Sequence, residues 1–519
     1  MSSQRRKQVY LLLMLLLLFP VSLLNRPPSA AGNQGWLYRL REKHNLGSVT
    51  LGEVDPTSHT INLVLVGMRG VAANVLWAEA QRLQDRHQWS ELKRAIKSIT
   101  LLQPHFLKVW DFQGWNLAYN VPNEWDNVED RYYWVKEGLK FLIEGYQKNP
   151  HRPELPWRIG KTYSHKLGQT DEAREFRRMF KEDQTFNREG EDNFLVGKRW
   201  FETAVRIGEP LLALADSPKE SDRERAMGMS PLIFFSSSGM AQINYAIMLI
   251  ADGVFGDTVP LAWSEGLRNW LEFGERRFRA PDVGEIRLEH DPADAARLQQ
   301  LTELVKTQRA PSGGITVERV AFGAGETVPA ESLQDARNEI LLLQSRQYWI
   351  ERYGGIVNYP YWRLRCQLES WRDDDGRPVA LEAHRYTYLG NGAHEEGDFP
   401  RARKLYDQAM QYWKRILEEE RFATALDDPQ LMTDVLSLIR HYRGILIHTG
   451  ELGEKDPLPE DFPLLAAWNH YQEEQNRRQE AEARRREMPG QGLRRGGGGG
   501  TGTGGGDTSP RQQRPPSEE

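Results

Sequence analysis

The sequence predicts a mainly α-helical protein whose helical hairpins stack into an α-solenoid. Long segments place apolar residues three or four positions apart, the spacing of one face of an α-helix. Small residues recur within these segments at Gly114, Gly160, Gly390 and Ala402, where two helices could approach each other closely. The two ends of the chain differ from the middle, because a hydrophobic N-terminal helix and a disordered C-terminal tail are expected there.

Composition is that of a folded protein and narrows the chemistry that is expected. Of the 519 residues, 39% are hydrophobic and 27% are charged, and the formal net charge is −5. A net negative charge argues against a general attraction to nucleic acid. Cys366 is the only cysteine, which excludes an intrachain disulfide, a CxxC redox pair and a zinc site of several cysteines. We expect no cofactor and no metal.

Residues 1–31 have the order of an export signal. Positive charge at residues 5–7 precedes an apolar run over residues 9–24, and the small side chains of residues 29–31 suit cleavage. The run is shorter than the roughly 20 residues that span a bilayer. It is either retained as a single-pass anchor in the cell membrane or cleaved to give a periplasmic or secreted protein. Both alternatives put the body outside the cytoplasm, because positive charge stays inside.

The middle of the chain is divided by composition and periodicity. Residues 32–70 form a spacer in which two β-branched stretches are typical of a short β-hairpin, and residues 71–187 carry the first helical repeats. Residues 188–306 are expected to form divergent helical hairpins, with a turn and helix cap from Ser236 to Gly239. Residues 307–331 are expected to be a flexible loop with one strand at 315–320.

The last part of the chain contains the clearest repeat and then loses its apolar residues. Residues 332–472 are expected to form a second helical lobe, with one repeat at 382–414. Residues 473–519 begin with mixed charge and continue as a glycine-rich segment. The charged run, residues 473–487, can be a frayed helix. The rest has no apolar surface to bury, so we expect a disordered tail there.

Several residues match the template of one repeat family. The first group is Trp110, Gly114, Leu117 and Pro150, and the second is Tyr386, Leu389, Gly390, Ala393, Gly397, Phe399, Ala402, Tyr406 and Ala409. In these two regions the chain resembles a tetratricopeptide-repeat protein, a family of paired antiparallel helices. It also resembles a group of bacterial membrane-anchored proteins, some labelled "iron-responsive element", although no residues here support iron or RNA binding. The resemblance implies concave surfaces that bind peptides or protein segments without catalysis.

The candidate partner-binding residues lie in an insertion between the two helices of one repeat. Residues 122–133 are expected to extend this loop, and Trp125, Asp126, Tyr132 and Trp134 lie in it or beside it. Loops carry function more often than cores do, so these four residues are the candidate site. The alternative is that the aromatic side chains fold back and cover the end of the array.

No catalytic motif is found. Asp373 to Gly376 lacks the spaced oxygen ligands of a calcium loop. His441 and His448 are seven residues apart, too far for the histidine pair of a zinc helix. Ser237 lacks the Gly-x-Ser-x-Gly elbow of a nucleophile. The prediction is therefore that the protein is not an enzyme.

Three hypotheses about function follow. The favoured one is a non-catalytic, membrane-anchored scaffold of the cell envelope that binds protein or peptide partners through its repeats. The alternative is an envelope enzyme, perhaps glycan-related, with a cleft between the helical lobes, which requires converging carboxylates or a histidine–carboxylate pair. The third is weak nucleic-acid binding through the basic, glycine-rich tail, although no nucleic acid is expected as a partner.

Overall fold

The structure is a computed structural model that describes residues 69–212, 214, 229–289, 291–306, 316–321, 324–329, 333–428 and 430–487. The expected signal or anchor at residues 1–31, the expected β-hairpin of the spacer and the glycine-rich segment of the tail lie outside the described residues. The described residues fall into two compact units, divided between Leu431 and Met432.

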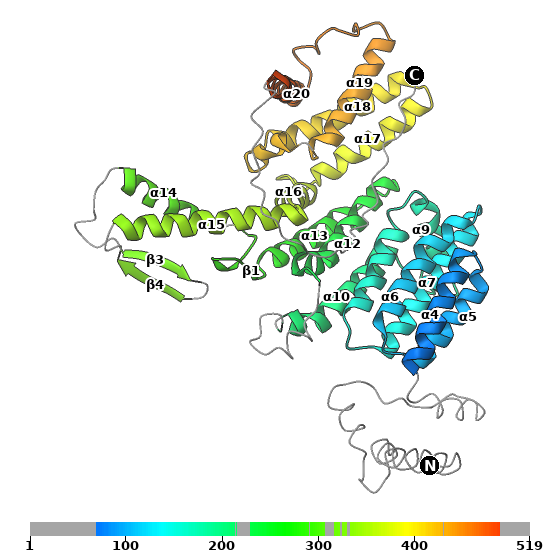
Figure 1. The fold of residues 1–519 in the computed structure, drawn as a ribbon. Helices are drawn as coiled ribbons and strands as arrows, with labels where there is room; N and C mark the ends of the chain where they lie inside the picture. Colours follow the sequence, from blue (N-terminus) through cyan, green and yellow to red (C-terminus); the bar gives the residue numbers. More distant parts are fainter. Residues whose placement is uncertain are drawn as a thin grey trace, which may run out of the picture. The chain divides into compact units, whose positions relative to one another are not determined.

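The described part of the chain is mainly α-helical, with two antiparallel sheets of two strands each. The second unit contains two helices, α19 (Met432–His448) and α20 (Leu465–Glu487). The first unit holds the remaining elements (Figure 1), which are α4 (Arg69–Asp85), α5 (Trp89–Leu102), α6 (Leu107–Trp115), η1 (Asn116–Asn120), η2 (Val121–Glu124), α7 (Val128–Lys148), α8 (Glu154–Lys161), η3 (Thr162–Lys166), α9 (Ala173–Glu182), α10 (Asn193–Leu212), α12 (Pro231–Ala251), α13 (Thr258–Gly274), β1 (Phe278–Ala280), β2 (Gly284–Ile286), α14 (Pro292–Lys306), β3 (Thr316–Ala321), β4 (Ala324–Pro329), α15 (Leu333–Val357), α16 (Tyr359–Ser370), α17 (Val379–Glu395), α18 (Phe399–Leu417) and η5 (Glu420–Asp427).

Close helix approach at small residues is confirmed in the first helices. A Cβ atom added at Gly114 of α6 would lie 2.4 Å from the Leu142 side chain of α7, and one added at Gly160 of α8 would lie 2.9 Å from the backbone of α10. Gly145 of α7 is just as close to the indole of Trp110. Any larger side chain would separate these pairs, because interior packing leaves no room for an extra methyl group.

The pair α17 and α18 shows how the sequence ends one helix and starts the next. Gly397 has φ 77°, a left-handed conformation that suits glycine and ends α17. The carboxylate of Asp398 accepts a hydrogen bond from the backbone N–H of Arg401 and caps α18. The two helices then pack together, with Ala402 fully buried and Gly390 facing the ring of Tyr406.

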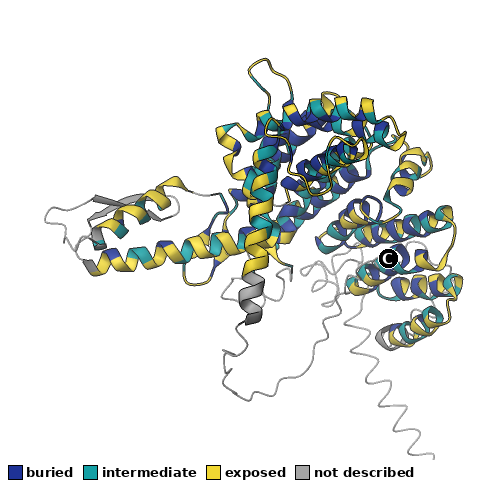
Figure 2. Cartoon of the chain, turned by 90° about the horizontal axis from the view of Figure 1, so that it is seen from above, coloured by how far each residue is buried: buried dark blue, intermediate teal, exposed yellow. Residues whose placement is uncertain are grey.

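A second core lies where α12, α13 and α16 pack, with the β1–β2 hairpin against it. Trp270 of α13 stacks on Tyr359 of α16 with ring centroids 5.9 Å apart, and its indole N–H donates to the Tyr359 carbonyl at 3.0 Å. Burial of two large rings in one contact stabilises this junction strongly. In Figure 2 the buried residues line the inner sides of the packed helices and the exposed residues line the outer sides.

One expectation about local structure is wrong. Residues Ser236 to Gly239 are not a turn, because α12 begins at Pro231 and runs through them. The hydroxyls of Ser236 and Ser237 donate to the carbonyl of Ile233, at 3.2 and 2.6 Å, which satisfies them inside the helix. The strand expected at 315–320 is present as β3, and β4 pairs with it in antiparallel orientation.

Among the described residues, α12 is long and apolar enough to cross a bilayer by length and composition. It lies in the middle of the chain and not at the N-terminus, and it packs against α10 and α13. Core helices pass the same test, so this property alone is weak evidence for membrane insertion.

Candidate functional site

Two π-helical segments lie at equivalent places in successive hairpins. The segment η1 continues α6 two residues after Gly114, and η3 continues α8 two residues after Gly160. The two segments contact each other. Single π-turns are rare in proteins and often occur at functional sites. The side chains that the two π-helical segments place together are therefore candidates for a functional site.

The π-helical segments bring Tyr119 and His165 into a stack. Their ring centroids are 5.8 Å apart with planes at 29°, and the Tyr119 hydroxyl lies 3.4 Å from Nδ1 of His165. Trp115 also stacks on Tyr119, with ring centroids 6.0 Å apart and planes at 20°. Three side chains from two hairpins thus form a continuous series of rings.

The series continues toward the first helix. Phe112 lies 6.2 Å from Trp115, and Trp77 of α4 lies 5.8 Å from Phe112, measured between ring centroids. We call the set Trp77, Phe112, Trp115, Tyr119 and His165 the aromatic row. Phe112 and His165 are exposed and the other three rings are half-buried. The row crosses three hairpins and reaches the surface at two of its five rings.

A network of hydrogen-bonded amide side chains connects the helices that carry the aromatic row. The Asn116 side chain is fully buried, and its carbonyl oxygen accepts from Asn120 at 2.9 Å and from Gln84 of α4 at 3.4 Å. The Asn116 amide donates in turn to Gln113 at 3.4 Å. A satisfied buried amide network of this kind specifies one arrangement of helices, so α4 and η1 are held in register.

One side of the row is cationic. Arg158 forms a two-point contact with the Asp111 carboxylate, which neutralises that charge. The remaining cations are Lys161 and Lys166, with His165 between them. Loss of hydration, followed by the charge of Arg158, lowers the pKa of Lys161. Loss of hydration and then the charges of Lys161 and Lys166 lower the pKa of His165.

The structure divides the four residues predicted from the sequence between a short connection and α7, but it keeps the rings of Trp125 and Trp134 together, with centroids 6.3 Å apart. Trp125 and Asp126 are exposed in the short connection between η2 and α7. The Trp125 carbonyl accepts a hydrogen bond from Arg131 at 2.6 Å, and Arg131 also pairs with Glu172. Trp125 and Asp126 therefore lie at the surface, with the Trp125 ring against that of Trp134.

Tyr132 and Trp134 do not belong to the loop, and the expectation of a loop up to residue 133 is wrong. The helix α7 begins at Val128, where Glu129 and Asp130 in the first turn suit the helix dipole. Tyr132 and Trp134 are 7% and 8% exposed, and the Tyr132 hydroxyl donates to Asp183 at 3.2 Å. Burial, together with the Asp183 charge, raises the pKa of Tyr132.

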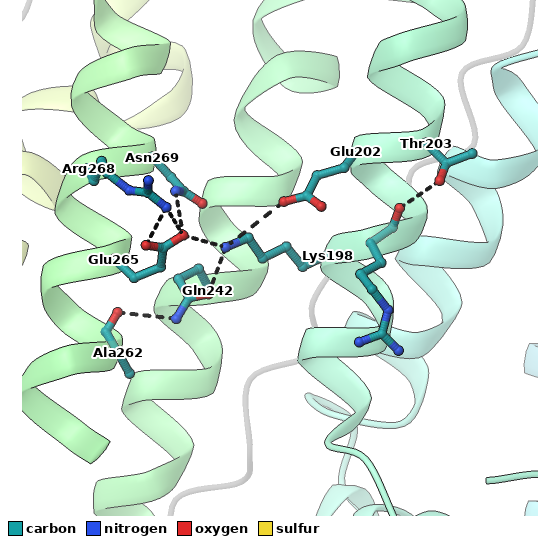
Figure 3. A network of polar contacts seen from close by, with 9 residues as sticks. Lys198, Glu202, Thr203, Gln242, Ala262, Glu265, Arg268 and Asn269 are labelled. Atoms are coloured by element: carbon teal, nitrogen blue, oxygen red, sulfur yellow. Dashed lines mark hydrogen bonds and ion pairs between the residues drawn. The ribbon is translucent and has the colours of Figure 1, made fainter. Parts of the chain in front are cut away.

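A separate polar network joins α10, α12 and α13 (Figure 3). The ammonium of Lys198 donates to Gln242 at 2.9 Å and to Glu265 at 3.0 Å, and the Gln242 amide donates to the Ala262 carbonyl at 3.2 Å. Partial burial opposes ionisation of Glu265, but hydrogen bonds from Arg268 and Lys198 outweigh it and lower its pKa to about 2. Because each charge has a partner, we assign this network to helix packing.

A buried ionic cluster connects α16 and α17. The Glu369 carboxylate accepts from Nε2 of His384 at 2.9 Å and pairs with Arg365 at 2.8 Å. Burial opposes ionisation, yet the charges of His384 and Arg365 hold the pKa of Glu369 below its usual range. Glu369 is only 2% exposed. Because the Glu369 carboxylate is paired with both cations, we assign the cluster to helix packing.

The comparisons with known proteins add no assignment. No protein-family model matches the sequence, and no curated protein matches it. Within the described residues, no group of three or more His, Cys, Asp and Glu side chains could hold a metal ion.

Sequence reasoning missed the aromatic row, although one signal pointed to it. Trp115, Asn116 and Tyr119 follow Gly114 at the same distances at which Lys161, Thr162 and His165 follow Gly160. Aligning the two segments on their glycines places Tyr119 opposite His165.

Proposed function

We propose that this protein is a non-catalytic scaffold that binds a segment of a partner protein on the aromatic row. The observation that carries the proposal is the series of rings from Trp77 to His165, which crosses three hairpins and stays accessible at Phe112 and His165. Aromatic side chains supply large contact area at low entropic cost, which is why they are enriched at binding surfaces.

The proposal includes a tetratricopeptide-like arrangement of the hairpins in an α-solenoid. Close packing at Gly114, Gly160 and Gly390, and the burial of Ala402, support it. In such repeats the first helix of each hairpin lines one continuous surface. The row follows this rule, because its rings come from α4, from α6 with η1, and from η3 after α8.

The proposed location is the outside of the cytoplasmic membrane, in the cell envelope. It is supported by the sequence of the first 31 residues, where positive charge precedes an apolar run. The N-terminal helix then either anchors the protein or is removed after export.

The function is tested by partner capture from solubilised membranes. The full chain carries a C-terminal tag and is compared with Trp115→Ala and with Tyr348→Ala, which removes a 51% exposed ring from α15. We expect one reproducible partner with the wild type and with Tyr348→Ala, and a loss of at least about tenfold with Trp115→Ala. Failure to recover any reproducible partner would contradict the proposal.

A further inference from the structure

We propose that the bound segment is acidic, and that its side-chain carboxylates are held by Lys161, His165 and Lys166 next to the aromatic row. This inference rests on the proposed function and adds the chemistry of the partner. It begins with a buried cation that has no anionic partner in the described part of the chain.

Lys166 is that cation. It is 5% exposed, and its ammonium lies 5.8 Å from the ring centroid of Tyr119 and 5.6 Å from that of Phe176. No carboxylate of the described residues lies within ion-pair distance of its Nζ atom. A buried charge without a partner is costly, and contact with two ring faces offsets only part of that cost. A carboxylate of the bound segment, placed beside the Tyr119 ring and near the Lys166 ammonium, would provide the anionic partner that this cation lacks.

The nearby carboxylates are largely engaged elsewhere. Asp111 is held by Arg158, and Glu172 is held by Arg131. Loss of hydration lowers the pKa of Lys166; Glu172 and, more weakly, the exposed Asp171 act against this, and the charge of Arg131 in turn opposes them. The local surface therefore keeps an excess of positive charge, and it lies directly beside the Tyr119–His165 stack.

Two lysines, and between them a histidine that gains its charge on acidification, form a short series rather than a single point. Lys161 is exposed, with its ammonium 5.4 Å from the Trp157 ring centroid, and His165 is exposed on the next turn, followed by Lys166. Three positions along one helix suit several carboxylates in sequence. This favours acidic side chains over a single chain terminus, and apolar side chains of the same segment would lie on Phe112 and Trp115.

Binding of short synthetic peptides to the purified full chain tests the inference by fluorescence anisotropy. The first peptide alternates leucine and glutamate, with both ends blocked. The second replaces every glutamate by glutamine. The third is the glutamine peptide with a free C-terminal carboxylate. We expect the first peptide to bind at least about tenfold more tightly than the other two.

Matched variants connect that binding to the site. Lys166→Met should weaken binding of the glutamate peptide by about tenfold or more, whereas Lys166→Arg should retain most of it. Lys97→Met removes an exposed lysine from α5 and should change nothing. Unfolding midpoints of all variants show whether a loss reflects misfolding, and Lys166→Arg keeps the test decisive if Lys166→Met is unstable.

The contrary outcomes are distinct. Equal binding of the glutamate and glutamine peptides, or binding of neither, overturns the acidic segment. Equal binding of the first and third peptides overturns side-chain carboxylates in favour of a terminal one. If Phe112→Ala abolishes binding of both blocked peptides while they bind the wild type equally, the aromatic row still binds a segment and only the charge assignment fails. The capture experiment tests the proposed function itself, independently of these peptides.

Discussion

Tyr119 and His165 stack at 5.8 Å although 46 residues separate them. Each lies in a π-helical segment at the same distance from a packing glycine, Gly114 or Gly160. The stack is therefore a consequence of two hairpins packing in register. The following predictions concern this packing, the charges that support it, and the surface that it builds.

Gly390 should tolerate no side chain, whereas its neighbour Gly392 should. A Cβ atom at position 390 would lie 2.5 Å from the fully buried ring of Tyr406, and one at position 392 would meet nothing within 4 Å. We expect Gly390→Ala to lower the free energy of unfolding by about 1–3 kcal/mol. Gly392→Ala should leave it unchanged or raise it by up to about 1 kcal/mol. Chemical denaturation measures both, and equal effects would contradict the packing described here.

Removing the charge of Glu369 should destabilise the protein most at neutral pH. Glu369→Gln leaves Arg365 and His384 without their anion in a buried site, at a cost of about 3–5 kcal/mol. The folded-state pKa of Glu369 is lowered, so its stabilisation is complete above the unfolded pKa of about 4.3 and is lost as the pH falls through the folded value.

The difference in unfolding midpoint between wild type and Glu369→Gln should therefore become smaller as the pH falls from 7 to 3. Unfolding midpoints across this range measure it. Glu91→Gln is the control, because this partly exposed side chain pairs only with Arg94 and should contribute less than about 1 kcal/mol. If the difference in unfolding midpoint stays constant on acidification, the charge of Glu369 is not the stabilising element.

Lys198→Met should loosen the junction of α10, α12 and α13. The change removes the donor to Gln242, which is 4% exposed, and leaves that amide oxygen without its partner. A loss of about 1–3 kcal/mol in the free energy of unfolding is expected. Lys148→Met, at an exposed lysine of α7, serves as the comparison and should change it by less than about 0.5 kcal/mol. Identical denaturation curves for the two variants would refute this role of Lys198.

Partner binding should strengthen on mild acidification. Loss of hydration, and then the charges of Lys161 and Lys166, lower the pKa of His165, so the ring is mostly neutral at pH 7. It gains its proton only as the pH falls below its ordinary value of about 6.5, while the glutamates of an acidic segment stay ionised until about pH 4.3. Affinity for the glutamate peptide should therefore rise between pH 7 and pH 5. His165→Gln should abolish the rise, and a rise that persists in this variant would assign it to another group.

The sequence predicts helix packing well, because a small residue at a contact is visible without coordinates. Gly114, Gly160, Gly390 and Ala402 all lie at close or buried helix contacts, as expected. The sequence predicts the start of α7 too late in the chain, because Pro122 and the polar residues after it resemble a loop. In the structure Pro122 lies in the first turn of the short helix η2, and Tyr132 lies inside α7.

The aromatic row depends on features that a periodic pattern does not show. A π-turn shifts the backbone hydrogen bonds by one residue, which changes the face on which Tyr119 and His165 lie. Spacing rules for regular helices cannot anticipate this shift. Likewise, the lack of an anionic partner for Lys166 follows from three-dimensional packing and from the pairing of Glu172 with Arg131, which are far apart in the sequence.

Photo-crosslinking in the native cell tests the central claim most directly. The photoreactive residue benzoylphenylalanine replaces Phe112, which is 42% exposed in the aromatic row, or Tyr348, which is 51% exposed on α15. We predict a discrete adduct with one partner protein at position 112 and none of the same mass at position 348. Adducts of equal yield at both positions, or no adduct at position 112, would contradict a partner-binding role for the aromatic row.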